Sequence, residues 1–255
     1  MRWIQNLGAW GVRFLTEMGA IGILFAQAVA GLFRRPFNLR GIARQMDALG
    51  VGSIPVVLIT ASFTGMVLAL QSHTGFKRFN AEGLVGTVVA LSMTRELGPV
   101  LTGLIVAGRA GAAMAAELGT MKVTEQVDAL ATLGVHPVKY LITPRLVAGL
   151  LMLPALTALA DLVGILGGYS LSVHLLDANP EVYLRRTKQY LEVADIFGGM
   201  LKAAVFGILI ATVSCYKGFQ ADGGAEGVGK ATTGAVVLSE MLILISDYFL
   251  TAMLF

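Results

Sequence analysis

The sequence is poor in charged residues and in cysteine, and each shortage excludes a class of protein. Only 14% of the residues are Asp, Glu, Lys or Arg, whereas soluble domains carry about a quarter. A hydrophobic share of 56% and a mean hydropathy of +0.75 accompany this shortage and indicate an integral membrane protein. The single cysteine, Cys215, excludes an intrachain disulfide and a cysteine-based metal site.

Signatures of catalysis and of nucleic-acid binding are also missing. The chain contains no G-x-S-x-G, no H-E-x-x-H and no cluster of aspartates suited to Mg²⁺. The net charge is only +3, and no more than two basic residues are adjacent, so no nucleic-acid partner is expected. We predict no catalytic residue, no metal site and no cofactor.

One stretch imitates a nucleotide-binding motif, Gly224-x-x-x-x-Gly229-Lys230. A phosphate-binding loop continues with Ser or Thr, whose hydroxyl binds Mg²⁺, and it follows a β-strand. Here Ala231 follows, and an apolar run lies before the glycines. We therefore expect no ATP binding at this stretch and interpret it as a flexible loop that leads into the last helix.

Five apolar segments are long enough to cross a membrane, which takes about 20 helical residues. The second of them exceeds the thickness of a bilayer, so one of its ends is expected to project. A short amphipathic helix is expected in the loop 177–195. The chain is thus predicted to be one all-α membrane domain, 1–255. The five spans are 48–76, 83–116, 146–176, 196–216 and 231–255.

The N-terminal segment 1–45 differs from these spans. Its uncharged part, 18–33, is short, and Trp3 and Trp10 stand in a mixed polar and apolar pattern before it. We expect one or two helices in the membrane interface, with the tryptophans at headgroup depth. A short sixth span is the alternative.

Basic residues are distributed unevenly between the two sets of loops. Nine lie on the side of the N-terminus, and five lie on the other side among acidic residues. Because basic loops stay in the cytoplasm, the N-terminus is predicted to be inside and the C-terminus outside. The nine are Arg34, Arg35, Arg40, Arg44, Lys122, Lys139, Arg145, Lys217 and Lys230, and the five are Lys77, Arg78, Arg185, Arg186 and Lys188.

Small residues recur at every fourth position of the second span. This spacing places them on one helix face, where they let another backbone approach closely. Packing within the subunit, a seam between subunits and a sliding face all agree with the pattern. The row is Gly103, Ala107, Gly111, Ala115 and Gly119, and a second row beside it is Gly108, Ala112, Ala116 and Thr120.

Charges inside the spans are candidates for function, because a charge at the bilayer centre costs roughly 2.5–3.5 kcal/mol on insertion scales. Arg95 and Glu96 are adjacent and point about 100° apart on a helix, so they are not expected to pair with each other. Lys202 and Asp247 are expected to pair or to line one polar path. The structural alternative is that all four are buried charges that fix helix register.

Gly98-Pro99, and the charged residues Arg109 and Glu117, can be explained by structural roles as well. Gly98-Pro99 can kink the second span beside Arg95, since proline removes one backbone hydrogen bond. The distortion would widen a cavity or simply bend the helix. Arg109 and Glu117 lie nearer the inner end of the span and are interpreted as structural.

The segment after the second span predicts a short amphipathic helix over 124–133. Thr124 can cap its N-terminus, and Glu125 and Asp128 lie in its first turn, where the helix dipole favours acidic groups. Gly134 can end it.

Val127 and Leu130 form the apolar face of this predicted helix, and Leu133 lies at its end. The helix would either rest on the membrane or dock into the groove of a cytoplasmic partner. An acidic first turn suits anionic lipid poorly and favours the protein partner.

The block TRELGPVLTGLIVAGRAGAAMAAELGTMKVTEQVDAL, 94–130, closely resembles the signature region of the MlaE/YrbE permease family. These proteins are the membrane subunits of ABC-type lipid transporters that work with MCE-domain proteins. The resemblance continues in HPVKYLITPRLVAGLLMLPAL, 136–156, and in GKATTGAVV, 229–237. It covers most of the chain except the N-terminal 45 residues.

The resemblance implies a permease homodimer in a bacterial inner membrane, with a periplasmic C-terminus and a phospholipid cavity between the two copies. A separate, MlaF-like ABC ATPase would hydrolyse ATP, so the chain itself would be non-catalytic. An MlaB-like STAS-domain protein would accompany the ATPase, and a ring of MlaD-like MCE proteins would sit on the periplasmic face. The implied task is to maintain the lipid asymmetry of the outer membrane.

On this sequence, the family's coupling helix corresponds to 124–133 and its lipid cavity to the intramembrane charges. The implied cavity residues are Arg95, Glu96, Lys202 and Asp247, and the implied coupling residues are Thr124, Glu125, Val127, Asp128, Leu130 and Leu133.

Two other functions remain as alternatives. An ion- or proton-coupled carrier would use Glu96, Lys202, Glu240 and Asp247 as a relay. A membrane enzyme acting on lipids is disfavoured, because the chain lacks catalytic motifs and its three histidines are scattered.

Overall fold

The computed structural model describes residues 2–32 and 38–254, and within these residues every regular element is helical. Six helical stretches of the described residues are long and apolar enough to cross a membrane, so the chain is an all-α integral membrane protein, as predicted. The α-helices are α1 (Arg2–Leu32), α2 (Leu39–Leu49), α3 (Ile54–Lys77), α4 (Val85–Ser92), α5 (Gly98–Val106), α6 (Ala112–Val123), α7 (Gln126–Thr132), α8 (Thr143–His174), α9 (Pro180–Tyr190), α10 (Val193–Phe219) and α11 (Gly224–Leu254).

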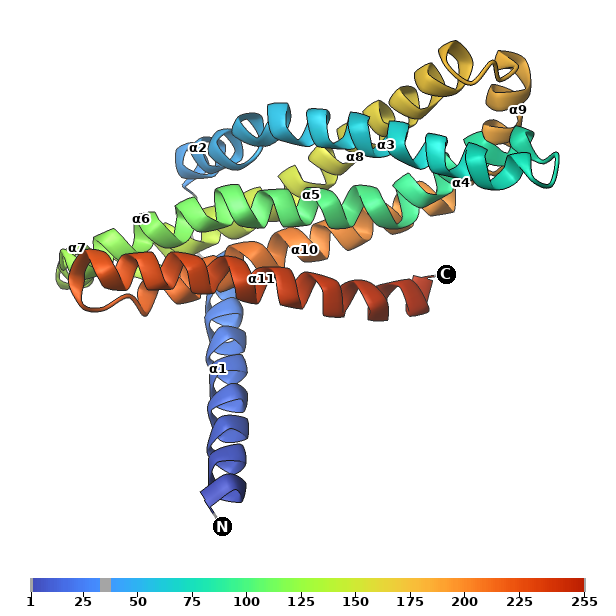
Figure 1. Cartoon of the computed structure of the whole chain (residues 1–255). Coiled ribbons are helices and arrows are strands. Elements are labelled where there is room, and N and C mark those ends of the chain that lie inside the picture. Colours follow the sequence, from blue (N-terminus) through green and yellow to red (C-terminus); the bar gives the residue numbers. More distant parts are fainter. Residues whose placement is uncertain (1, 33–37, 255) are drawn as a thin grey trace.

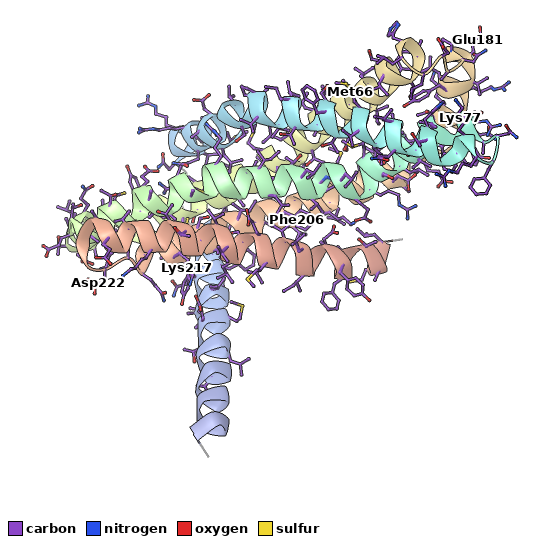
Figure 2. All side chains as sticks on the ribbon, viewed as in Figure 1. Met66, Lys77, Glu181, Phe206, Lys217 and Asp222 are labelled. Carbon is purple, nitrogen blue, oxygen red and sulfur yellow. The ribbon has the colours of Figure 1, made fainter. Side chains whose placement is uncertain are left out.

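The long helices from α3 to α11 form one bundle, with α7 at one end and α9 and the C-terminus at the other (Figure 1). Within the bundle, α8 packs against α3 and α10, and α10 also packs against α6 and α11. Glu181 and Lys77 lie at the α9 end and Asp222 at the α7 end (Figure 2). Helix α9 is the short helix that the sequence predicts within 177–195.

Helix α1 runs across the direction of the bundle (Figure 1). The Thr143 hydroxyl donates a 3.0 Å hydrogen bond to the carbonyl of Ala28, and Lys217 pairs with Glu17 where α1 meets the bundle (Figure 2). A helix that lies across the bundle cannot span the membrane alongside it. This orientation favours the interfacial interpretation of α1 over a sixth span, although 15–32 is apolar enough for one. The side chains of Trp3 and Trp10 lie outside those that the structure describes.

The second span is helical from Glu82 to Val123. Two of its turns, Met93–Leu97 and Ala107–Gly111, are π-helical rather than α-helical. Its 42 residues exceed the roughly 30 Å hydrocarbon core at about 1.5 Å per residue. The first π turn directly precedes Gly98-Pro99, where proline withholds a backbone donor. The predicted distortion is present, and Arg95 and Glu96 lie inside it.

The helix after the second span begins later than predicted, at Gln126 rather than Thr124. Thr124 does not cap it, because α6 continues through Val123 and the Thr124 hydroxyl donates back to the carbonyl of Thr120 at 2.8 Å. Glu125 then turns the chain with a φ of +60°. The predicted end is correct, since Gly134 has a φ of +74°.

The expectation of a flexible loop at Gly224–Lys230 is wrong. This stretch forms the first turns of α11, and Lys230 pairs with Glu226 one turn earlier at 2.7 Å. Its helical backbone is not the loop conformation that a phosphate-binding motif requires.

The first row of small residues faces the interior of its own subunit. A Cβ atom added at Gly103, Gly111 or Gly119 would lie within 3.4 Å of a side chain of α10, of α11 or of the turn between them. Ala107 and Ala115 are fully buried. The structure therefore assigns this row to packing within the subunit.

Two glycines face each other where α8 and α10 cross. A Cβ atom added at Gly149 would lie 2.5 Å from the carbonyl oxygen of Gly207, and one added at Gly207 would approach the Gly149 carbonyl more closely still. Only residues without a side chain permit this contact between backbones.

Gly207→Ala is expected to lower the free energy of unfolding by about 1–3 kcal/mol, because α8 and α10 must separate to admit the methyl group. Thermal unfolding in detergent measures the loss. Gly108→Ala is the matched control, since no atom beyond its own stretch of helix lies within 4 Å of its added Cβ and alanine favours a helix. Equal melting temperatures for the two variants would contradict the close contact.

Candidate functional site

A buried network of charged side chains lies where the first π turn of the second span meets α10 and α11. Lys202 is its centre: the side chain is 0% exposed, and Nζ lies 2.8 Å from Glu96 Oε2 and 3.1 Å from Asp247 Oδ1. One ammonium group therefore faces two carboxylates from two other helical segments. We call the following residues the Lys202 network: Arg95, Glu96, Asp195, Lys202, Asp247 and Thr251.

The π turn gives Lys202 a backbone acceptor as well. A widened turn disturbs the regular pattern of helical hydrogen bonds, and here the carbonyl of Arg95 accepts from Lys202 Nζ at 3.0 Å. Thr251 Oγ1 accepts at 2.6 Å and Glu96 at 2.8 Å. Asp247 Oδ1, 3.1 Å from the same nitrogen, completes the set of oxygens around the ammonium group as an ion pair.

The network reaches the surface through Arg95 and Glu96. Their side chains are 33% and 38% exposed, while Lys202 is fully enclosed. Arg95 Nε lies 3.7 Å from Asp195 Oδ1, and Asp195 also accepts from the backbone N–H of Glu192 at the start of α10. As predicted, Arg95 and Glu96 pair with other residues rather than with each other, and Lys202 pairs with Asp247.

Sequence reasoning missed two members of the network. Asp195 was expected to belong to the outer loop, whereas it lies in the first turn of α10. Thr251 could have been predicted from the sequence, because it follows Asp247 by four residues and therefore lies on the same helix face.

Two further arginines hold the α7 end of the bundle together. Arg109 donates to the carbonyl of Ala48 at 3.2 Å and to Ser53 Oγ at 2.9 Å, which ties the second span to the connection between α2 and α3. Arg145 pairs with Glu117 at 2.7 Å. These contacts agree with the structural interpretation of Arg109 and Glu117.

Of the apolar residues in and next to α7, some face the bundle and one faces away from it. Val127 is buried, and Leu130 packs against the neighbouring apolar core, so these two side chains attach α7 to the bundle. Leu133 is 77% exposed, and Thr124, Glu125 and Asp128 are exposed as well. Asp128 pairs with Lys122 at 3.0 Å. Leu133 is thus a large exposed apolar side chain among polar ones at this end of the bundle.

Lys202→Met is expected to lower the free energy of unfolding by about 3–5 kcal/mol, because Glu96 and Asp247 lose their shared cation. Denaturant unfolding of the purified permease measures this loss. Lys188→Met, at an exposed position of α9, is the control. Adding Asp247→Asn to Lys202→Met should restore part of the stability; no difference between the two lysine variants would contradict the buried ion pairs.

Comparison with known proteins agrees with the resemblance noted in the sequence. A probable ABC transporter permease protein of Rickettsia typhi is 50% identical over 253 residues, which is 99% of this chain and 98% of that protein. The chloroplastic protein TRIGALACTOSYLDIACYLGLYCEROL 1 of Arabidopsis thaliana is 39% identical over 92% of this chain and 67% of its own length.

The intermembrane phospholipid transport system permease protein MlaE of Haemophilus influenzae is 35% identical over 100% of this chain and 98% of that protein. The family described as permease MlaE matches residues 42–253. This match covers the π turn, the Lys202 network and α7. The chain therefore belongs to the MlaE permease family.

Proposed function

We propose that this chain is the permease subunit of an ATP-driven phospholipid transporter in a bacterial inner membrane, and that the transporter maintains outer-membrane lipid asymmetry. Family membership and a Haemophilus relative named for phospholipid transport support the proposal. One structural observation carries it: the exposed α7 and the surface-reaching Lys202 network occur in one bundle, with α7 at the end opposite the C-terminus (Figure 1).

The Lys202 network is the proposed lipid site. Arg95 is partly exposed, and its planar guanidinium group suits the paired oxygens of a phosphate. Lys202 and Asp247 would hold α10 and α11 in place behind it, while Glu96 connects them to the second span. A second copy of the chain would close the cavity around the acyl chains.

Helix α7 is the proposed docking site for a separate, MlaF-like ABC ATPase. Leu133, Glu125 and Thr124 are exposed at this end, whereas Val127 and Leu130 are attached to the bundle. A push from the ATPase on the exposed residues would therefore pass to α6 and α8 through packed side chains. An MlaB-like STAS-domain protein would bind with the ATPase.

The opposite end, with α9 and the C-terminus, would face a periplasmic ring of MlaD-like MCE proteins. The distribution of basic residues supports this orientation, with the N-terminus in the cytoplasm. In this arrangement ATP is hydrolysed outside the chain, and the permease converts movement at α7 into a change of the lipid cavity.

A second candidate function is an ion- or proton-coupled carrier. It is favoured by one observation, that Glu96 and Asp247 share the single cation Lys202, because an excess carboxylate can take up a proton. Transport in vesicles distinguishes the two functions: a carrier would require a proton gradient, whereas the proposed permease would require ATP and a bound ATPase.

Leu133→Asp is expected to reduce co-purification of the ATPase several-fold, because it places a charge in the docking surface, while the permease remains folded. Quantitative pull-down from membranes measures the effect. Leu175→Asp is the matched control, since Leu175 is similarly exposed but ends α8, away from α7. Unchanged ATPase binding by Leu133→Asp would contradict docking at α7.

Arg95→Ala is expected to lower the amount of phospholipid that co-purifies with the assembled complex, because the phosphate loses its guanidinium partner. Glu96→Ala should act in the same direction by releasing Lys202. Lipid extraction with mass spectrometry measures occupancy, and Arg185→Ala on the exposed side of α9 is the control. Full occupancy in an assembled Arg95→Ala complex would remove this residue from the cavity.

A further inference from the structure

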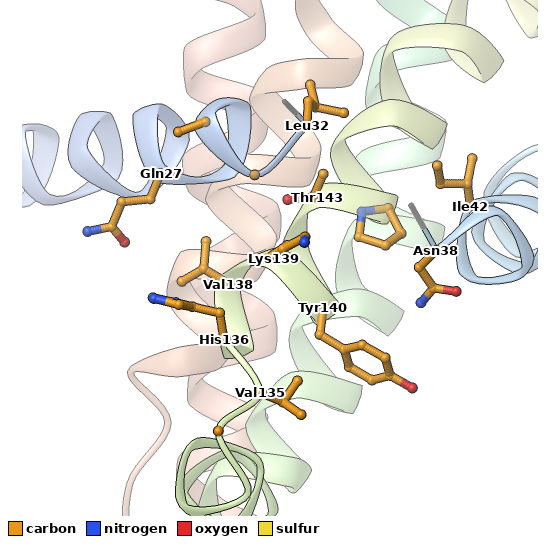
Figure 3. A pocket seen from close by; sticks show the side chains of 14 residues that line it. Gln27, Leu32, Asn38, Ile42, Val135, His136, Val138, Lys139, Tyr140 and Thr143 are labelled. Carbon is orange, nitrogen blue, oxygen red and sulfur yellow. The ribbon is translucent and has the colours of Figure 1, made fainter. Parts of the chain in front are cut away.

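A groove separate from the Lys202 network lies at the α7 end of the bundle. It runs between the end of α1, the start of α2 and the segment 134–144, and its volume is about 920 Å³. Figure 3 shows Lys139 between His136 and Tyr140 in its wall. None of the described residues that line it belongs to the network.

The walls of the groove combine apolar surface with a few polar groups. Leu32, Ile42 and Val138 supply apolar surface, while Lys139 and Tyr140 bring a cation and a hydroxyl. Pockets of several hundred cubic ångströms with such a lining bind amphipathic small molecules. The lining therefore selects a ligand with an apolar body and an acidic or strongly polar group.

The position of α1 places the groove at the membrane interface. Val12, Leu15 and Ile23 are exposed on α1, although α1 runs across the bundle (Figure 1). An exposed apolar helix in this orientation lies at the boundary between headgroups and acyl chains. Leu32, at the end of α1, lines the groove, so lipid is the amphipathic molecule that surrounds it.

Lys139, the only lysine or arginine among the described residues that line the groove, favours an anionic lipid. Arg40 and Arg44 are exposed on α2, and neither forms an ion pair with any residue that the structure describes. Ile42, which lies between them in sequence, lines the groove. Residues two apart on a helix point about 160° away from each other, so the two arginines face away from the groove and act on the membrane surface around it. Basic side chains at a membrane surface attract anionic lipid with about 1 kcal/mol each.

We propose that this groove binds one anionic phospholipid from the leaflet on the α7 side, as a constituent of the permease and not as its cargo. The phosphate lies toward Lys139, and an acyl chain follows the apolar surface of α1. This lipid joins α1 to the segment that follows α7. The proposal does not depend on transport at the Lys202 network.

Photocrosslinking of the complete transporter in vesicles tests the proposal. The vesicles contain phosphatidylethanolamine and phosphatidylglycerol, with a fraction of phosphatidylglycerol that carries a diazirine in its acyl chain. Peptide mass spectrometry is expected to find the label in 24–32 or in 134–144. Ala30→Phe fills the groove from an exposed lining position and should reduce this labelling several-fold.

Ala26→Phe is the matched control, because Ala26 is exposed on the same helix but does not line the groove. Lys139→Gln should also reduce the labelling, whereas Lys188→Gln at the other end should not, so the test does not rest on one variant. Thermal unfolding checks that each variant is folded.

Two results would overturn the proposal. Equal labelling of the groove peptides in Ala30→Phe and Ala26→Phe would show that the lipid lies elsewhere. Labelling of the isolated permease that disappears in the complete complex would show that a protein partner occupies the groove. ATP-driven transport is measured in the same vesicles, so a failure of the lipid site is distinguished from a failure of the proposed function.

Discussion

The close approach of helix backbones around α8 is the constraint on which the rest of the structure depends. Inside a membrane, lipid tails are as apolar as leucine, so helices associate through tight packing and polar contacts rather than through the hydrophobic effect. Gly149 of α8 meets Gly207 of α10, and on the α3 side Gly164 leaves no room for a Cβ atom at Gly65. These contacts set where α3 and α10 lie against α8.

The position of α10 then determines the chemistry of the Lys202 network. Lys202 lies about one and a half turns before Gly207 on α10, and the packed helix directs its ammonium group into the π turn of the second span. A charge enclosed in this way is tolerable only when its partners are in place. Glu96, Asp247 and the Arg95 carbonyl supply them, so the network both requires the helix packing and reinforces it.

The two ends of the bundle differ in what they expose. At one end, α7 is attached by buried side chains and Leu133 is exposed. The groove between α1, α2 and the segment 134–144 lies at the same end. Toward the other end, the network reaches the surface through Arg95. This separation suits a subunit that receives movement at one place and handles a lipid at another. In the proposed function, the helices between them would be the physical connection.

The sequence by itself determined the class of protein and most element positions, because apolar length and small-residue spacing are local properties of the chain. It also indicated the charges inside the membrane, the lack of a phosphate-binding loop and the end of α7 at Gly134. Only the tertiary structure decided which charges pair, since Lys202, Glu96 and Asp247 come from segments far apart in the chain. It also corrected two local expectations. Thr124 closes α6 because the helix before it continues, and Gly224–Lys230 is helical because α11 extends beyond its apolar part.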